Sequence, residues 1–253
     1  MVTGSDIRSV FRMNERAKKA YISLLTVVTL ICILIGTFRF FSFRGGNVGR
    51  RKGEEAGLEE FSTLTVRVSA ADVIVEKGRS YQVELSEGQE LSYVVKDGEL
   101  IISETRKGLL HTERSGHAVI TVPSGAELSS VTISTDYGNI TLDGVGTETA
   151  SLQTSAGNIT IKDSEVSTAS IVSNMGNITL NDTVFVSVDA AADLGNITAD
   201  LDTEPEDCSL SLKTDLGEIK VDGDKKGREY QTEQNGGSQF TAVSNLGNIK
   251  VGF

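Results

Sequence analysis

The five-residue phrase Gly138-Asn139-Ile140-Thr141-Leu142 returns along the second half of the chain and decides its fold. Three close copies follow it at one constant interval, and two looser copies follow after longer intervals. A fixed period of about 20 residues indicates a repeat architecture in which each repeat is one structural unit. The copies begin at the turn glycines Gly138, Gly157, Gly176, Gly195, Gly217 and Gly247.

Apolar residues alternate with polar ones on both sides of each turn glycine. This period of two is typical of short β-strands with one buried face. Each copy is therefore predicted to be a strand, a turn and a second strand, in which Asp, Asn or Ser supports the turn and glycine supplies a positive φ. The second residue after each glycine is predicted to form a core ladder of Ile140, Ile159, Ile178, Ile197, Ile219 and Ile249.

One such unit is too small to fold alone. Burying four aliphatic side chains contributes roughly 1.5–3 kcal/mol each, whereas ordering the backbone of one unit costs about 1–2 kcal/mol per residue. Units that stack and share hydrogen bonds remove this deficit. The equal spacing therefore predicts an all-β fold, a parallel β-solenoid of about 19-residue rungs. An antiparallel sandwich is the alternative, but it does not require matched residues at a constant interval.

Charge is distributed unevenly along the 253 residues, whose net charge is −11. Residues 1–52 contain ten Lys or Arg and two Asp or Glu, whereas residues 53–253 contain 14 and 33, a balance of −19. An acidic domain without a basic stripe disfavours nucleic acid as a partner. The two cysteines, Cys32 and Cys208, lie in an apolar run and an acidic loop, so no disulfide is predicted.

Residues 21–38 carry no charge and precede an aromatic and basic stretch. A segment of this length spans a hydrocarbon core with help from its ends, so residues 21–43 are predicted to form a transmembrane helix that anchors the protein in the membrane. The small residues that a cleaved signal peptide needs after its apolar run are missing. Residues 1–20 are assigned as a basic cytoplasmic tail and the C-terminal domain as extracellular, although both flanks carry five Lys or Arg.

A Gly-rich linker over residues 44–60 is predicted to separate this anchor from the β-domain, residues 61–253. Within that domain, residues 61–123 alternate without the strict repeat and are expected to form an irregular opening section that caps the stack. Residues 124–253 are expected to form the repeat stack. The chain ends two residues after the last aliphatic, which indicates an uncovered C-terminal edge unless residues 222–238 fold over it or another molecule pairs there, so self-association through this edge is a candidate interaction.

Neither catalytic nor metal-ligating residues stand out. His111 and His117 lie in one polar stretch, and no Ser or Cys has the surroundings of a nucleophile, so no enzyme activity and no cofactor are predicted. The Asp, Ser or Asn two residues before each turn glycine leaves calcium binding as an alternative, although turn chemistry explains these residues. The asparagines after the glycines are expected to form an internal amide ladder. A candidate binding face is the outward column Thr141, Thr160, Thr179 and Thr198.

A family resemblance is carried by the N-terminal apolar helix, the strand-like stretches around 72–75, 100–102 and 119–123, and the returning Gly-Asn-Ile phrases. Together they resemble the bacterial β-strand-repeat family named "putative adhesin", which is similar to the head domains named for a Gly-Ile-Asn motif. The resemblance covers residues 61–253. It implies a β-solenoid at the cell envelope with a role in surface adhesion or envelope stress, and it implies no catalytic residues.

The resulting hypothesis is a membrane-anchored, non-enzymatic envelope protein that binds or adheres to an unknown envelope ligand or protein. Two alternatives remain open at this point. One is a self-assembling envelope scaffold, and the other is a regulatory ectodomain in an envelope-stress response that meets cationic peptides through its acidic charge.

Overall fold

A computed structural model describes residues 58–86, 91–104, 116–234 and 237–253. The chain divides into two compact units, Met1–Asn47 and Val48–Phe253, and all described residues belong to the second. The expected tail 1–20, the expected membrane helix 21–43 and nearly all of the expected linker 44–60 lie outside the described residues. Within the described ranges no helix is long and apolar enough to cross a membrane.

The described part of the second unit is built almost entirely from β-strands, apart from the short 3-10 helix η1 (Pro205–Asp207). Most strand pairs are parallel, so the prediction of an all-β fold of parallel strands is confirmed. The strands are β1 (Thr63–Gly78), β2 (Gln82–Leu85), β3 (Leu91–Lys96), β4 (Glu99–Glu104), β5 (Gly116–Pro123), β6 (Glu127–Tyr137), β7 (Ile140–Asp143), β8 (Gly146–Ala156), β9 (Ile159–Lys162), β10 (Glu165–Met175), β11 (Ile178–Leu194), β12 (Ile197–Leu201), β13 (Cys208–Leu216), β14 (Ile219–Val221), β15 (Asp224–Gly227), β16 (Glu229–Gln231), β17 (Ser238–Leu246) and β18 (Ile249–Gly252).

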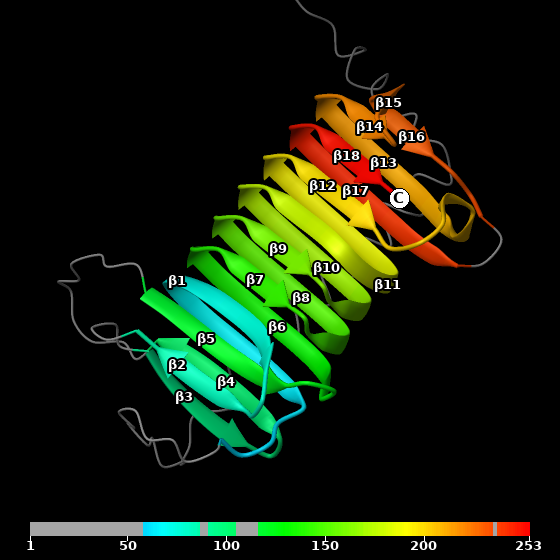
Figure 1. The fold of residues 1–253 in the computed structure, drawn as a ribbon. Coiled ribbons are helices and arrows are strands. Elements are labelled where there is room, and N and C mark those ends of the chain that lie inside the picture. The colour runs from blue at the N-terminus through cyan, green and yellow to red at the C-terminus, as the bar shows by residue number, and fades with distance from the viewer. Residues whose placement is uncertain (1–57, 87–90, 105–115, 235–236) are drawn as a thin grey trace, which may run out of the picture. The chain divides into compact units, whose positions relative to one another are not determined.

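Each rung places a long strand in one sheet and a short strand in a second sheet, with the turn glycine between them. We call the sheet of strands before the glycines sheet A and the sheet of strands after them sheet B. In the regular region, paired residues stand one repeat apart in sequence, as with Leu152 and Ile171 in sheet A and Ile159 and Ile178 in sheet B. The repeat period is therefore the register of the stack. The turns form a row along one edge (Figure 1).

The core lies between the two sheets and consists of columns of equivalent side chains. Alternating residues of each strand are buried, as in the pattern of β7, where Ile140 and Leu142 have no exposed surface and their neighbours are half-buried. A third column of small hydroxyl side chains is buried next to the turns. It comprises Thr135, Thr154, Ser173, Thr214 and Ser244.

The rungs do not follow one another in sequence order at the C-terminal end. The last strands of the chain, β17 and β18, lie between the β11–β12 rung and the β13–β14 rung. Figure 1 shows the red strands β17 and β18 between the yellow strand β12 and the orange strands β13 and β14. Sheet A has the order β3, β4, β1, β6, β8, β10, β11, β17, β13, β16, and sheet B has the order β2, β5, β1, β7, β9, β11, β12, β18, β14, β15.

The expected uncovered C-terminal edge is therefore wrong, because β18 is paired on both sides, with β12 and with β14. Self-association through that edge loses its structural basis. The end of the stack is instead formed by β13 and β14, and the antiparallel strands β16 and β15 pair with them. These two strands carry Lys225, Lys226 and Glu229, the kind of charged side chains that protect a sheet edge from further pairing.

The opening section is only partly the irregular cap that the sequence indicates. Strand β1 runs through both sheets inside the stack, between the β4 and β5 strands on one side and β6 and β7 on the other. The capping strands are β2 and β3, which pair antiparallel with β5 and β4. The first strand of the domain, β1, and its last strands, β17 and β18, thus both lie one rung in from an end of the stack.

Candidate binding surface

The turns bring the backbones of successive rungs into direct contact. A Cβ atom on Gly176 would overlap the carbonyl oxygen of Gly157, and the same holds for the other turn glycines against the rung beside them. Gly138 and Gly176 also have φ of 153°. The close approach, rather than the positive φ expected from the sequence, is what all six positions share.

The isoleucines that follow the turns occupy equivalent positions in neighbouring rungs. Ile140 pairs with Ile159, Ile159 with Ile178, and Ile178 with Ile197. Ile249 then stands between Ile197 and Ile219. All six are fully buried. They form a continuous apolar column under sheet B, which holds the turns above it in a fixed position.

The asparagines that follow the turn glycines form a hydrogen-bonded ladder along the surface. The side-chain oxygen of each accepts the backbone N–H of the next asparagine at 2.9 Å and its side-chain N–H at 3.2–3.3 Å. Asp72 accepts from Asn139 at one end, and the N–H of Glu218 donates to Asn248 at the other. The ladder is exposed, so its expected internal position is wrong.

Buried hydroxyls tie the same turns together from the inside. Thr154 and Ser173 donate to the carbonyl oxygens of Gly138 and Gly157 at 3.0 Å. Thr214 and Ser244 make the equivalent bonds to Gly247 and Gly195 at 2.8 and 2.9 Å. Except at the β11 rung, where Ala192 pairs with Ser173 and has no hydroxyl, each turn is therefore held by its neighbour on both faces.

Apolar side chains stand in line at the tips of these turns, directly before each glycine, and all except the half-buried Ala156 are exposed. Neighbouring members are paired in sheet A. Five of them are large and 46–65% exposed. We call this column the turn ridge; in stack order it comprises Tyr137, Ala156, Met175, Leu194, Leu246 and Leu216.

The turn ridge is flanked on both sides by acidic and amide side chains. On the sheet A side the column reads Asp136, Ser155, Asn174, Asp193, Asn245 and Asp215. On the sheet B side stands the asparagine ladder, followed by Glu218. Neither flanking column contains a basic residue. Basic residues near the ridge's Leu216 end stand farther out on the sheets, and two of them, Lys220 and Lys225, lie 3.4 and 2.6 Å from the Glu218 carboxylate.

The predicted threonine face is also aligned, but it is less accessible. Thr141, Thr160, Thr179 and Thr198 pair in sequence along sheet B and are half-buried. The column continues into Lys250 and Lys220. Small polar side chains such as these offer hydrogen bonds but little apolar surface.

Groups suited to catalysis or metal binding do not converge among the described residues. No cluster of three His, Cys, Asp or Glu side chains there could hold a metal ion. His117 is exposed on β5, whereas His111 and Cys32 lie outside the described ranges. Burial raises the pKa of the Cys208 thiol to about 11, which keeps it protonated and unreactive near neutral pH.

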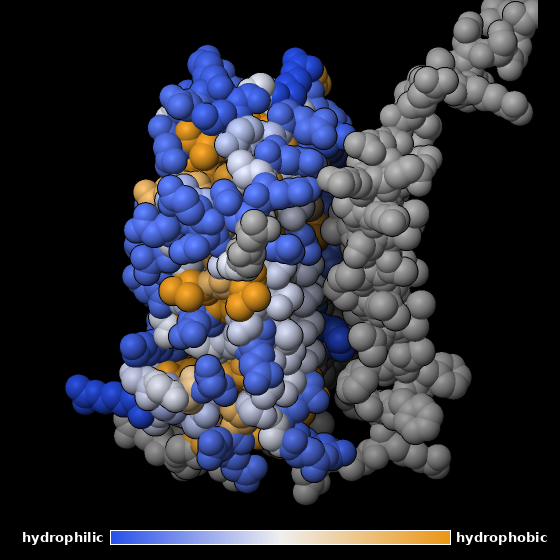
Figure 2. Space-filling view, turned by 90° about the vertical axis from the view of Figure 1, so that its right-hand side faces the viewer, coloured by the Kyte–Doolittle hydropathy of each residue, from blue (hydrophilic) through white to orange (hydrophobic). Residues whose placement is uncertain are grey.

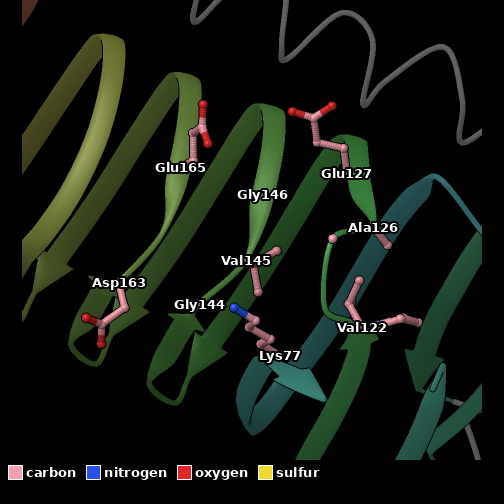
Figure 3. A pocket seen from close by; sticks show the side chains of 11 residues that line it. Lys77, Val122, Ala126, Glu127, Gly144, Val145, Gly146, Asp163 and Glu165 are labelled. Carbon is pink, nitrogen blue, oxygen red and sulfur yellow. The ribbon is translucent and has the colours of Figure 1, made fainter. Parts of the chain in front are cut away.

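The hollow at the opposite edge of the stack, about 320 Å³ in volume, is open and polar. Lys77 extends towards the backbone of Gly144 and Val145, while Glu127, Asp163 and Glu165 belong to different rungs and point away from one another (Figure 3). Side chains that diverge in this way cannot surround a small ligand. The hollow is therefore a weaker candidate than the turn ridge.

A family model described as Toastrack DUF4097 matches residues 63–252, which is most of the chain. The chain belongs to this family. No curated protein sequence is significantly similar to it. The match spans the stack from β1 to β18, including both inserted rungs, and we refer to this part as the Toastrack domain.

Two solved structures are similar to the Toastrack domain over most of their length. One is named a "putative cell adhesion protein" from Clostridium sporogenes, with 13% identity, a TM-score of 0.39, and coverage of 76% of this chain and 93% of that one. The other is named a "putative adhesin" from Bacteroides fragilis, with 13% identity, a TM-score of 0.41, and coverage of 77% and 94%.

The sequence contains a pattern that indicates the turn ridge, but the alternation used to predict the strands does not include it. The residue before the turn glycine is Tyr, Met or Leu in five of six copies, although a turn tip in water needs no large apolar side chain. Asp72, by contrast, belongs to the ladder only because β1 lies beside β7, which no sequence spacing indicates.

Proposed function

We propose that the protein is a non-enzymatic binding module, anchored to the cell membrane by residues 21–43 and displayed on the outside of the cell, with the turn ridge as its contact surface. The observation that carries this proposal is the line of exposed apolar side chains from Tyr137 to Leu216. Monomeric soluble proteins rarely expose contiguous apolar patches larger than a few hundred Å², and patches of that size mark interaction sites.

The turns that carry the ridge suit a binding surface because their backbone is already ordered before a partner binds. Close backbone approach and the asparagine ladder fix each turn against the next, and buried hydroxyls such as Ser173 add to this in all rungs but that of β11. A rigid surface loses little conformational entropy when it binds, so more of the contact free energy remains as affinity. Figure 2 shows one face of the molecule, on which separate apolar patches lie among hydrophilic and neutral surface.

Display outside the cell is tested on intact cells that express the full chain with an epitope after Phe253. Added protease should remove the epitope while a cytoplasmic control protein survives, because the proposed anchor leaves only residues 1–20 inside. An epitope that survives as well as the cytoplasmic control contradicts the display.

Use of the turn ridge is tested by placing a photoreactive amino acid at Leu194 or, as a control, at Val186. Both side chains are exposed and belong to β11, but Val186 lies about 26 Å from the ridge along the strand. Irradiated cells should give covalent adducts at position 194 and far fewer at position 186. Equal yields at the two positions contradict a specific contact at the ridge.

A further inference from the structure

We infer that the turn ridge binds an amphipathic α-helix with basic flanks, presented by a partner along the length of the stack. This inference rests on the proposed function and names the partner's chemistry. It follows from two properties of the ridge, the spacing of its apolar side chains and the sign of the charges beside them.

The spacing of the ridge is set by the hydrogen-bonded stack. Neighbouring parallel strands lie about 4.8 Å apart, and the ridge has one side chain per rung, as the pairs Met175–Leu194 and Leu194–Leu246 show. From Tyr137 to Leu216 the ridge therefore extends about 24 Å. An α-helix of about 16 residues has this length.

The distance between successive apolar side chains on one face of a helix nearly matches the spacing of the ridge, whereas that of an extended peptide does not. The apolar stripe of an amphipathic helix advances about 5.2 Å per side chain. Side chains on one face of a strand advance about 6.6–6.8 Å. Over the five intervals of the ridge, a helix falls out of step by about half an interval, and a strand by about two. Only the helix can place an apolar side chain against every rung.

The charges beside the ridge select a basic partner. Asp136, Asp193 and Asp215 stand in the column next to the ridge and are exposed, and neither flanking column holds a basic residue. Lysine or arginine side chains that border the apolar stripe of a helix would reach these carboxylates. Complementary charge of this kind increases association rates and specificity.

The same charges disfavour two other occupants. A second copy of the chain would match the spacing, but it would place two columns that each contain three aspartates against each other. A bilayer surface would accept the apolar side chains, but anionic headgroups repel an acidic border. Both are separate outcomes in the test below.

The experiment uses the full-length protein in nanodiscs of zwitterionic lipid, with empty nanodiscs subtracted. Three fluorescent peptides, each about as long as the ridge when helical, are titrated and followed by anisotropy. The first is a helix with a leucine stripe and lysine flanks, the second has glutamate in place of lysine, and the third has the composition of the first in an order that destroys the stripe. The first should bind at least tenfold more tightly than either of the others.

Matched variants locate the binding. The double substitution Leu194→Ser/Leu246→Ser removes ridge side chains that are 47% and 46% exposed, and Val184→Ser/Val186→Ser removes side chains that are 47% and 61% exposed elsewhere on the domain. The ridge double substitution should weaken binding of the lysine-flanked peptide at least tenfold, and the control double substitution should weaken it less than twofold. Asp193→Asn/Asp215→Asn should reduce the preference for lysine over glutamate peptides at least threefold. Circular dichroism checks that each variant is folded.

Equal binding of the first and third peptides, or no effect of the ridge variant, would overturn the inference in favour of diffuse charge attraction. Ridge-dependent binding to phosphatidylglycerol vesicles without peptide binding would overturn it in favour of a membrane surface. Ridge-dependent dimers in sedimentation would overturn it in favour of a second copy. If crosslinking at position 194 succeeds in cells while the peptides fail, the binding function stands and the helical partner falls.

Discussion

In each rung the turn glycine lies against the backbone of the rung beside it. Sequence spacing was sufficient to predict that Gly138 and its equivalents form turns. It explained only in part why these positions require glycine. Only Gly138 and Gly176 among the six have φ in the range that favours glycine, whereas a Cβ at any of the six would overlap a neighbouring carbonyl oxygen. The contact is made by residues a full repeat or more away in the chain, which a local reading of turn chemistry cannot include.

Gly176→Ala should therefore destabilise the Toastrack domain strongly. The new Cβ would overlap the carbonyl oxygen of Gly157, which is main chain and cannot move without disturbing the ladder. We expect a loss of about 2–3 kcal/mol in the free energy of unfolding, as for other overpacked sites. Urea denaturation of the full-length protein, followed by circular dichroism, measures it.

Gly146→Ala is the matched control for this substitution. A Cβ there would meet the Glu127 Cγ at 3.4 Å, an ordinary contact with a flexible side chain. Its effect should stay within about 0.5 kcal/mol. If the two variants lose equal stability, the close approach of the turn backbones is not what requires glycine at position 176.

The asparagine ladder joins the turns into one element that extends along the whole ridge. Its members were recognisable in the sequence because they follow the turn glycines, but its position and its ends were not. The prediction placed the ladder inside the stack. The structure shows it exposed, because side chains at the outer surface of a turn face water. The ends depend on which rungs are neighbours: Asp72 reaches Asn139 from the first strand of the domain, and Glu218 reaches Asn248 in the last rung of the chain.

Asn177→Ala should interrupt this element in its middle. The substitution removes one hydrogen bond to Asn158 and two that Asn177 accepts from Asn196. Each hydrogen bond contributes about 0.5–1.5 kcal/mol net, and water replaces part of this at an exposed site. The free energy of unfolding should fall by about 1–2 kcal/mol. Asn174→Ala, in the same turn but outside the ladder, should change it by less than about 0.5 kcal/mol. An equal effect of both substitutions means that the ladder does not stabilise the stack.

The order of the rungs is the property of the whole molecule that sequence could not supply. All rungs carry the same buried columns, so the apolar pattern determines the register between any two neighbours but not which two are neighbours. Ile249 shows this directly, because it pairs both with Ile219, one copy of the repeat earlier in the chain, and with Ile197, two copies earlier. Composition and repeat period were therefore sufficient to predict the strands, the sheets and the core. They were insufficient to predict that the two end rungs are inserted into the stack.

The insertion of both end rungs also changes how stability is distributed. In a solenoid stacked in sequence order, the last rung has one free side and opens first. Here β17 is paired with β11 on one side and with β13 on the other, and β1 is enclosed in the same way. Opening either segment requires separating two pairs of parallel strands at once.

Hydrogen exchange of the full-length protein tests this arrangement. Backbone amides of β17 (Ser238–Leu246) should be protected nearly as strongly as those of β10 in the middle of the stack, although β17 belongs to the last rung of the chain. The capping strands β15 and β16 have pairing on one side only among the described strands. Their amides should exchange at least tenfold faster, because edge strands open locally without unfolding the core. If β17 exchanged as fast as β15 and β16, the last rung would lie at an open edge, and the distribution of stability argued from its two-sided pairing would be wrong.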